Sequence, residues 1–102
     1  METSVRTSNG MAELHIKGRF DFSRHRGFKD EYEPLIGNDQ INVIAVNLSG
    51  VDYMDSSALG MLLMLRDRAL GANKKVVLNN PNHTVAQILD IANFDKLFTI
   101  NK

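Results

Sequence analysis

Alternation of apolar and polar positions predicts two strands at the amino end of the chain. Residues 2–8 are short and partly β-branched, which suits an edge strand, and Asn9-Gly10 follows them. Over residues 11–20, leucine and isoleucine alternate with charged side chains, as is typical of a half-buried strand. Asn-Gly between two such stretches favours a tight hairpin turn. We therefore predict an amino-terminal β-hairpin.

The spacing of apolar residues then changes to that of a helix. A turn from Gly18 to Asp21 is expected to end the second strand, and residues 22–36 carry aromatic and aliphatic side chains at helical spacing. Ser23 is the predicted amino-terminal cap of this helix. Gly37 is its predicted stop.

The middle of the chain predicts a buried strand, a helix and a second buried strand. Residues 41–48 are apolar on both faces, which favours a central strand. An acidic turn follows, and then a helix from about Ser56 to Leu70. Gly71 is expected to end that helix in the left-handed region, where glycine is favoured. Residues 74–78 predict the next strand.

The last third of the chain predicts one more helix and a short ending. Asn82 can cap a helix over residues 82–92, and Asn93 can end it in the left-handed region. Residues 97–100 form a short strand or simply pack. With 102 residues, the chain is a single domain, 1–102, of the α/β class, with a mixed sheet of four to five strands packed against helices.

Composition excludes several function classes. Twelve basic residues balance twelve acidic ones, whereas nucleic-acid binding needs a basic face. With no cysteine, the chain has neither disulfides nor thiolate metal sites. There is no G-x-S-x-G motif, and the three histidines lie apart in the sequence, so we predict no enzyme, no metal and no cofactor. No signal pattern and no apolar run of about 20 residues occurs, which predicts a cytoplasmic protein without membrane contact.

The helix over residues 56–70 carries the most informative surface. On a helical wheel its sheet-facing side is predicted to consist of Leu59, Leu62, Leu63, Ala69 and Leu70. Arg66 falls on the same side, and its head is expected to reach the sheet edge. The opposite, solvent-facing side is predicted to carry the partner-binding residues, because methionine adapts to different partners. That side consists of Gly60, Met61, Met64 and Arg68.

Two serines open this helix. The first N–H groups of a helix lack internal acceptors, so Asp-Ser-Ser alone is most often a cap. A phosphate is also favourable there, because the macrodipole is positive and a phosphate carries about −1.5 to −2 charges. On Ser56 or Ser57 it would join Asp55, Asp52 and Asp21 in an acidic patch. Like charges at an interface cost on the order of several kcal/mol, enough to release a partner.

Three stretches carry a family resemblance. Residues 54–60, MDSSALG, resemble the signature M-D-S-S/T-G-L-G of the STAS domain of anti-sigma-factor antagonists. Residues 18–21, GRFD, are similar to the family's G-x-hydrophobic-Asp, and residues 85–100 resemble its closing helix and tail. The departures are Ala58, where glycine is usual, and Asn93, near the position of a common glycine.

The resemblance implies a partner-switching protein. In that family the unphosphorylated protein binds a GHKL-type serine kinase that is also an anti-sigma factor, phosphorylation releases it, and a PP2C-type phosphatase restores binding. Carried over, Ser56 rather than Ser57 is the acceptor, and Asp21 and Asp55 flank it. The free protein is expected to be a monomer.

The same fold offers a second reading. Some STAS domains are constitutive subunits of an ABC-type lipid transporter, where they bind the ATPase without a phosphorylation cycle. Ala58 favours that reading, since D-S-S-A-L-like runs occur in that class. Asp21 and the intact Asp55-Ser56 pair favour the switch.

Overall fold

Strands and helices alternate along most of the chain. The computed structural model describes residues 2–102, with side chains from residue 5 onward. Its elements are β1 (Glu2–Ser8), β2 (Met11–Phe20), the 3-10 helix η1 (Phe22–Arg24), α1 (His25–Ile36), β3 (Val43–Met54), α2 (Ser56–Gly71), β4 (Lys75–Asn79), α3 (His83–Ile91), the 3-10 helix η2 (Phe94–Lys96) and β5 (Thr99–Asn101).

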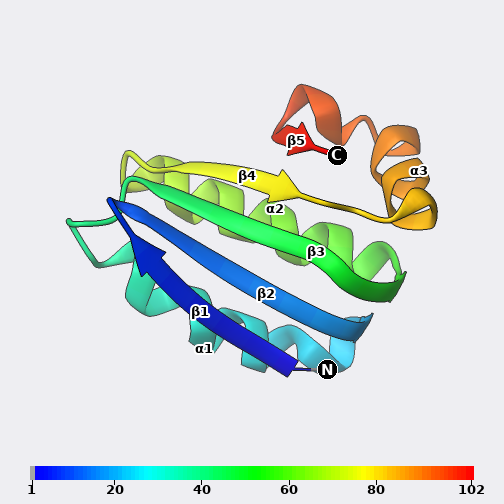
Figure 1. Cartoon of the computed structure of the whole chain (residues 1–102), viewed down its shortest axis with the longest axis horizontal. Coiled ribbons are helices and arrows are strands. Elements are labelled where there is room, and N and C mark those ends of the chain that lie inside the picture. Colours follow the sequence, from blue (N-terminus) through cyan, green and yellow to red (C-terminus); the bar gives the residue numbers. More distant parts are fainter. Residues whose placement is uncertain (1) are drawn as a thin grey trace.

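The five strands form one mixed sheet. Their order is β1-β2-β3-β4-β5; β1 is antiparallel to β2 and every other neighbouring pair is parallel. Both α1 and α2 lie on the same face of the sheet, and α3 lies beyond the end of β4 (Figure 1). The predicted α/β domain with a mixed sheet is confirmed.

The core lies between the sheet and the pair α1 and α2. Alternate residues of the strands face the helices, and burial of each leucine or isoleucine contributes about 1.5–3 kcal/mol. Phe20 of β2 meets Phe28 of α1 edge to face, with ring centroids 5.1 Å apart. The fully buried side chains include Leu14, Ile16, Ile44, Val46, Leu48 and Leu78 from the sheet and Ala58, Leu62 and Leu65 from α2.

Three local predictions are confirmed by the backbone. Asn9 and Gly10 both have positive φ, 50° and 81°, as a two-residue hairpin turn requires. The side-chain oxygen of Asn82 accepts a hydrogen bond from the N–H of Val85 at 2.8 Å and so caps α3. Asn93 adopts the left-handed conformation with φ of 58°.

Two strands are longer than predicted. The turn expected from Gly18 is absent because β2 continues to Phe20; Gly18 has φ of 85° and lies at a shift in register. Strand β3 runs on to Met54 instead of ending at residue 48. The physical reason is that β2 and β3 pair with each other as far as Phe20 and Met54. This pairing gives backbone hydrogen-bond partners to polar residues whose composition is typical of a turn.

Two helix ends also differ from the prediction. Ser23 does not cap the first helix; the carboxylate of Asp21 does, and the helix begins as the 3-10 turn η1. Helix α2 includes Gly71, and Asn73, with φ of 60°, is the residue that turns left-handed. Asparagine tolerates this conformation almost as glycine does, so a glycine alone does not fix where a helix ends.

Candidate functional site

Two aspartates leave neighbouring strands at the same edge of the sheet. Phe20 of β2 pairs with Met54 of β3, and these strands are parallel. The ends of these two strands lie at the right of Figure 1, and Asp21 and Asp55 are the residues that follow them. Ser56, the next residue, opens α2.

Both carboxylates cap the helix that follows them. The carboxylate of Asp55 accepts a hydrogen bond from the N–H of Ala58 at 3.0 Å. That of Asp21 accepts from the N–H of Ser23 at 3.0 Å and from the Ser23 hydroxyl, and it lies 3.5 Å from Nε of Arg19. The hydrogen bonds from Ser23, with a smaller contribution from Arg19, lower the pKa of Asp21. Asp21 is therefore a carboxylate at neutral pH.

The two serines differ in their surroundings. Ser56 is exposed at the first position of α2, whereas Ser57 is half-buried. Because Asp55 already supplies the cap, the Ser56 hydroxyl is not needed for that purpose.

One exposed row of α2 begins at Ser56. Gly60 and Met64 follow at intervals of four residues, so the three lie on one face of the helix. Gly60 is exposed, and a Cβ added to it would meet nothing within 4 Å. Met64 is 48% exposed. We call these three residues the Ser56 row.

The predicted exposure of Met61 is wrong. Its side chain is only 5% exposed, because α2 packs against α1 as well as the sheet, which widens the buried part of the helix. Arg68, two turns later on the same side, is exposed but donates both guanidinium NH2 groups to the carboxylate of Glu33 in α1. Leu70, predicted to face the sheet, is 52% exposed.

Two exposed aromatic residues at this edge were not singled out from the sequence. Phe22, next to Asp21, is 67% exposed and stacks on His25 with ring centroids 5.4 Å apart. Tyr53, near the end of β3, is 41% exposed, and the Arg19 guanidinium lies 4.1 Å from its ring centroid. Exposed aromatic side chains are enriched at protein interfaces. The signal in the sequence is that both aromatics lie within two residues of the site aspartates.

Residues 2–102 contain neither a metal-binding cluster nor a membrane-spanning helix. Within this range, no group of three or more His, Cys, Asp or Glu side chains is placed to hold a metal ion. No helix in the same range is both long enough and apolar enough to cross a membrane.

Sequence comparison links the chain to STAS domains. A family model described as "Mlab, STAS domain" matches residues 3–99. A STAS-domain containing protein of Pseudomonas aeruginosa (strain UCBPP-PA14) is 47% identical over 88 residues, which cover 86% of this chain and 85% of that protein.

Structural comparison finds the same fold in regulators and in transporters. A putative anti-sigma factor antagonist of Thermotoga maritima superposes with a TM-score of 0.87 at 20% identity, covering 98% of this chain and 86% of that one. The phosphorylated form of the Bacillus cell fate determinant SpoIIAA gives 0.75 at 15% identity, covering 99% and 92%. The STAS domain of a SulP transporter from Vibrio cholerae gives 0.75 at 20% identity, covering 95% and 77%.

Proposed function

Because this chain belongs to the STAS-domain family, we propose that it is an anti-sigma-factor antagonist whose docking is controlled by phosphorylation of Ser56. One observation carries the proposal: exposed Ser56 begins a row of exposed residues on α2, followed by Gly60 and Met64. The solved relatives include an anti-sigma factor antagonist in its phosphorylated form.

A phosphate fits Ser56 without rearranging the fold. The side chain is exposed, and the unpaired N–H groups and macrodipole of α2 favour negative charge at this end. The same charge is unfavourable for a partner, because Asp21 and Asp55 already make this edge acidic. A docked protein would meet a concentrated negative patch, and like charges across an interface cost on the order of several kcal/mol.

The proposed partner contact is the Ser56 row together with its surroundings. Gly60 removes any side chain from the middle of the row and lets a partner approach the helix backbone. Asp21, Asp55, Ser57 and Arg68 border the row, and Phe22 and Tyr53 add exposed aromatic surface. Met61 is not part of this proposed contact surface, because its side chain is buried.

Gly60→Ala is expected to change stability and partner affinity in opposite directions. Glycine inside a helix costs about 1 kcal/mol relative to alanine, and the added methyl group has open space. We expect the free energy of unfolding, measured in urea, to rise by up to about 1 kcal/mol, while affinity for the partner falls. Higher stability with unchanged affinity would show that no partner backbone approaches this position.

In the proposed cycle, the unphosphorylated protein binds a GHKL-type serine kinase that also acts as the anti-sigma factor. The kinase transfers the γ-phosphoryl group of ATP to Oγ of Ser56, whose proton is lost, and the complex separates. A PP2C-type phosphatase hydrolyses the phosphoserine and restores binding. The protein itself performs no catalytic step.

Intact-protein mass spectrometry tests the acceptor. The protein is incubated with its candidate kinase and ATP, and the mass is expected to increase by one phosphate. The increase should disappear in Ser56→Ala and persist in Ser57→Ala, because Ser56 is exposed whereas Ser57 is half-buried. Phosphate retained in Ser56→Ala would contradict the assignment.

A constitutive subunit of an ABC-type lipid transporter is the second candidate. The observation in its favour is Ala58, which is fully buried where the switch signature has glycine. Stable binding to a transporter ATPase, with no phosphate acquired on Ser56 and no loss of binding in Ser56→Asp, would support this candidate over the switch.

A further inference from the structure

One face of the sheet has no helix against it. Helices α1 and α2 both lie behind the sheet in Figure 1, and within residues 2–102 no helix passes in front of β2, β3 or β4. These three strands and β5 are parallel to one another. Parallel sheets occur almost only in proteins where both faces are covered. The uncovered face is therefore unusual for strands of this type, and we examine it as an interface.

The uncovered face is apolar at its centre. Ala45 of β3 and Val77 of β4 pair with each other and are buried, yet neither belongs to the core between the sheet and the helices. Side chains two positions apart on a strand share a face, so half-buried Val43 lies on the same side as Ala45. Met11 of β2 pairs with Val43 and is 41% exposed. We call the surface centred on these four residues the open face.

Opposite charges lie on the two strands that flank β3. Glu13 of β2 pairs with Ala45, and Lys75 of β4 pairs with Val43. The carboxylate of Glu13 is held on this face by a hydrogen bond of 2.7 Å between its Oε1 and Nε2 of His15. The open face therefore carries a carboxylate on one side of its apolar centre and a cation on the other.

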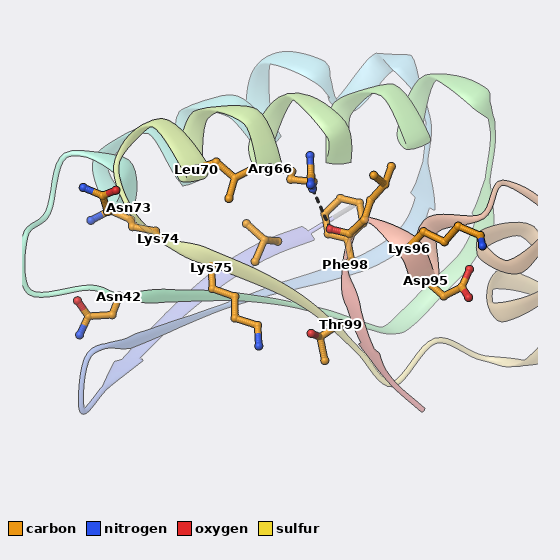
Figure 2. Close-up of a pocket in the computed structure, with 12 residues that line it drawn as sticks. Asn42, Arg66, Leu70, Asn73, Lys74, Lys75, Asp95, Lys96, Phe98 and Thr99 are labelled. Atoms are coloured by element: carbon orange, nitrogen blue, oxygen red, sulfur yellow. Dashed lines mark hydrogen bonds between the residues drawn. The ribbon is translucent and has the colours of Figure 1, made fainter.

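Figure 2 shows the direction of the Lys75 side chain. Lys75 and Thr99 point away from α2, whereas Leu70 and Arg66 lie on the α2 side. The Nε of Arg66 donates to the carbonyl of Leu97 at 2.8 Å, so Arg66 reaches the sheet edge as predicted and is bound within the chain. Lys75 is exposed, and it is the cation that β4 contributes to the open face.

We propose that two copies of this chain pack their open faces together as a dimer. The two-fold axis runs along β3, so that β2 of one copy lies over β4 of the other. Met11 and Lys75 both pair with Val43, so the stem of Lys75 covers Met11 of the other copy. Its ammonium group then reaches Glu13, two residues further along that strand. The symmetry makes this contact twice, and aligned packing of two sheets about 10 Å apart is a common arrangement.

A two-fold axis that runs across the strands fits less well. It would lay β4 over β4 of the other copy, and β4 carries no acidic residue. Lys75 would then face a strand without a carboxylate. The charge pattern of the open face therefore selects the axis along β3.

The size of the open face is sufficient but leaves little to spare. The molecule spans 34 by 26 Å in the view of Figure 1. A stable interface buries roughly 800 Å² on each partner, so the dimer has to use most of this face. We therefore expect a reversible dimer rather than a permanent one.

The dimer leaves the Ser56 row exposed. Helix α2 lies on the other side of the sheet, so the two rows face outward from the dimer (Figure 1). In this proposal the free protein is a dimer, whereas the family resemblance implies a monomer. Phosphorylation of Ser56 plays no part in the contact.

Sedimentation velocity of the full chain over a range of concentrations measures the association. We expect a monomer–dimer equilibrium, and amide chemical shifts that change with concentration most strongly at Ala45 and Val77. Lys75→Glu places a carboxylate against Glu13 of the other copy and should weaken dimerisation at least about tenfold. Lys29→Glu is the matched control, since it makes the same change at an exposed lysine of α1, and it should leave dimerisation unchanged.

Exchange of the two charges tests the contact itself. Glu13→Lys should weaken dimerisation as Lys75→Glu does. The double variant, Glu13→Lys with Lys75→Glu, restores the pair with its charges reversed and should dimerise almost as the unmodified protein does. Urea unfolding of each variant shows whether it is folded. Ser56→Asp should dimerise like the unmodified protein.

Several results would overturn the proposal. These are a monomer at millimolar concentration, concentration-dependent shifts centred on α2, or equal dimerisation of the Lys75→Glu and Lys29→Glu variants. A folded double variant that associates no more tightly than Lys75→Glu would also overturn it. Any of these results would leave the Ser56 proposal intact, because its readouts are a mass increase and the affinity for a kinase.

Discussion

Replacing Ser56 with aspartate is expected to abolish binding of the kinase-type partner while the protein stays folded. The new carboxylate adds a charge where Asp21 and Asp55 already follow the ends of adjoining strands, so a docked surface would have to accept a third negative group. Like-charge contacts cost on the order of several kcal/mol, which corresponds to a loss of roughly 100-fold or more in affinity. Isothermal titration calorimetry with the purified partner measures this loss.

The stability of the same variant distinguishes a docking role from a structural one. Ser56 is exposed, and the amino end of α2 favours negative charge, so the free energy of unfolding should change by less than about 0.5 kcal/mol. Ser8→Asp is the matched control, since it makes the same change at an exposed position beside the hairpin turn, away from this edge. A collapse in melting temperature of Ser56→Asp, or an equal loss of binding in Ser8→Asp, would contradict the account.

Met61→Glu is expected to destabilise the fold, whereas Met64→Glu is expected to weaken partner binding. Met61 is 5% exposed in the core, so its replacement buries an unpaired carboxylate and should destabilise the fold by about 4 kcal/mol. Met64 is 48% exposed on the Ser56 row, so its replacement should leave unfolding nearly unchanged and weaken the partner complex by on the order of 1–3 kcal/mol. Urea unfolding and calorimetric binding, measured on both variants, separate the two effects.

Met11→Glu is the matched control for Met64→Glu. Met11 is 41% exposed and lies at the start of β2, at the opposite end of that strand from Asp21. Its replacement makes the same chemical change on a similarly exposed methionine and should leave affinity unaltered. Equal weakening by Met11→Glu and Met64→Glu would mean that the loss reflects net charge rather than contact on α2.

Local signals in the sequence predicted those parts of the fold that local chemistry determines. The Asn9-Gly10 turn, the Asn82 cap and the left-handed Asn93 each depend on one or two residues and their backbone preferences. The length of β3 depends instead on pairing with β2, which lies more than twenty residues earlier in the chain. Such pairing overrides the turn-like composition around Gly50, and no local pattern reveals it.

The positions of the candidate site residues were easier to predict at the ends of the strands than on the surface of α2. The motif located Asp21 and the Asp55-Ser56 pair, and parallel pairing of β2 with β3 explains why these residues follow neighbouring strand ends. The helical wheel failed for Met61 because it assumes one buried face, whereas α2 packs against both the sheet and α1.

The most direct test compares one partner against two forms of the same protein. The stoichiometrically phosphorylated protein, confirmed by intact mass, and the unphosphorylated protein are each titrated with the kinase-type partner in a nucleotide state that prevents further transfer. We expect tight binding of the unphosphorylated form, loss of binding on phosphorylation, and recovery after treatment with a serine phosphatase. Equal affinity of the two forms would contradict control of docking by phosphorylation.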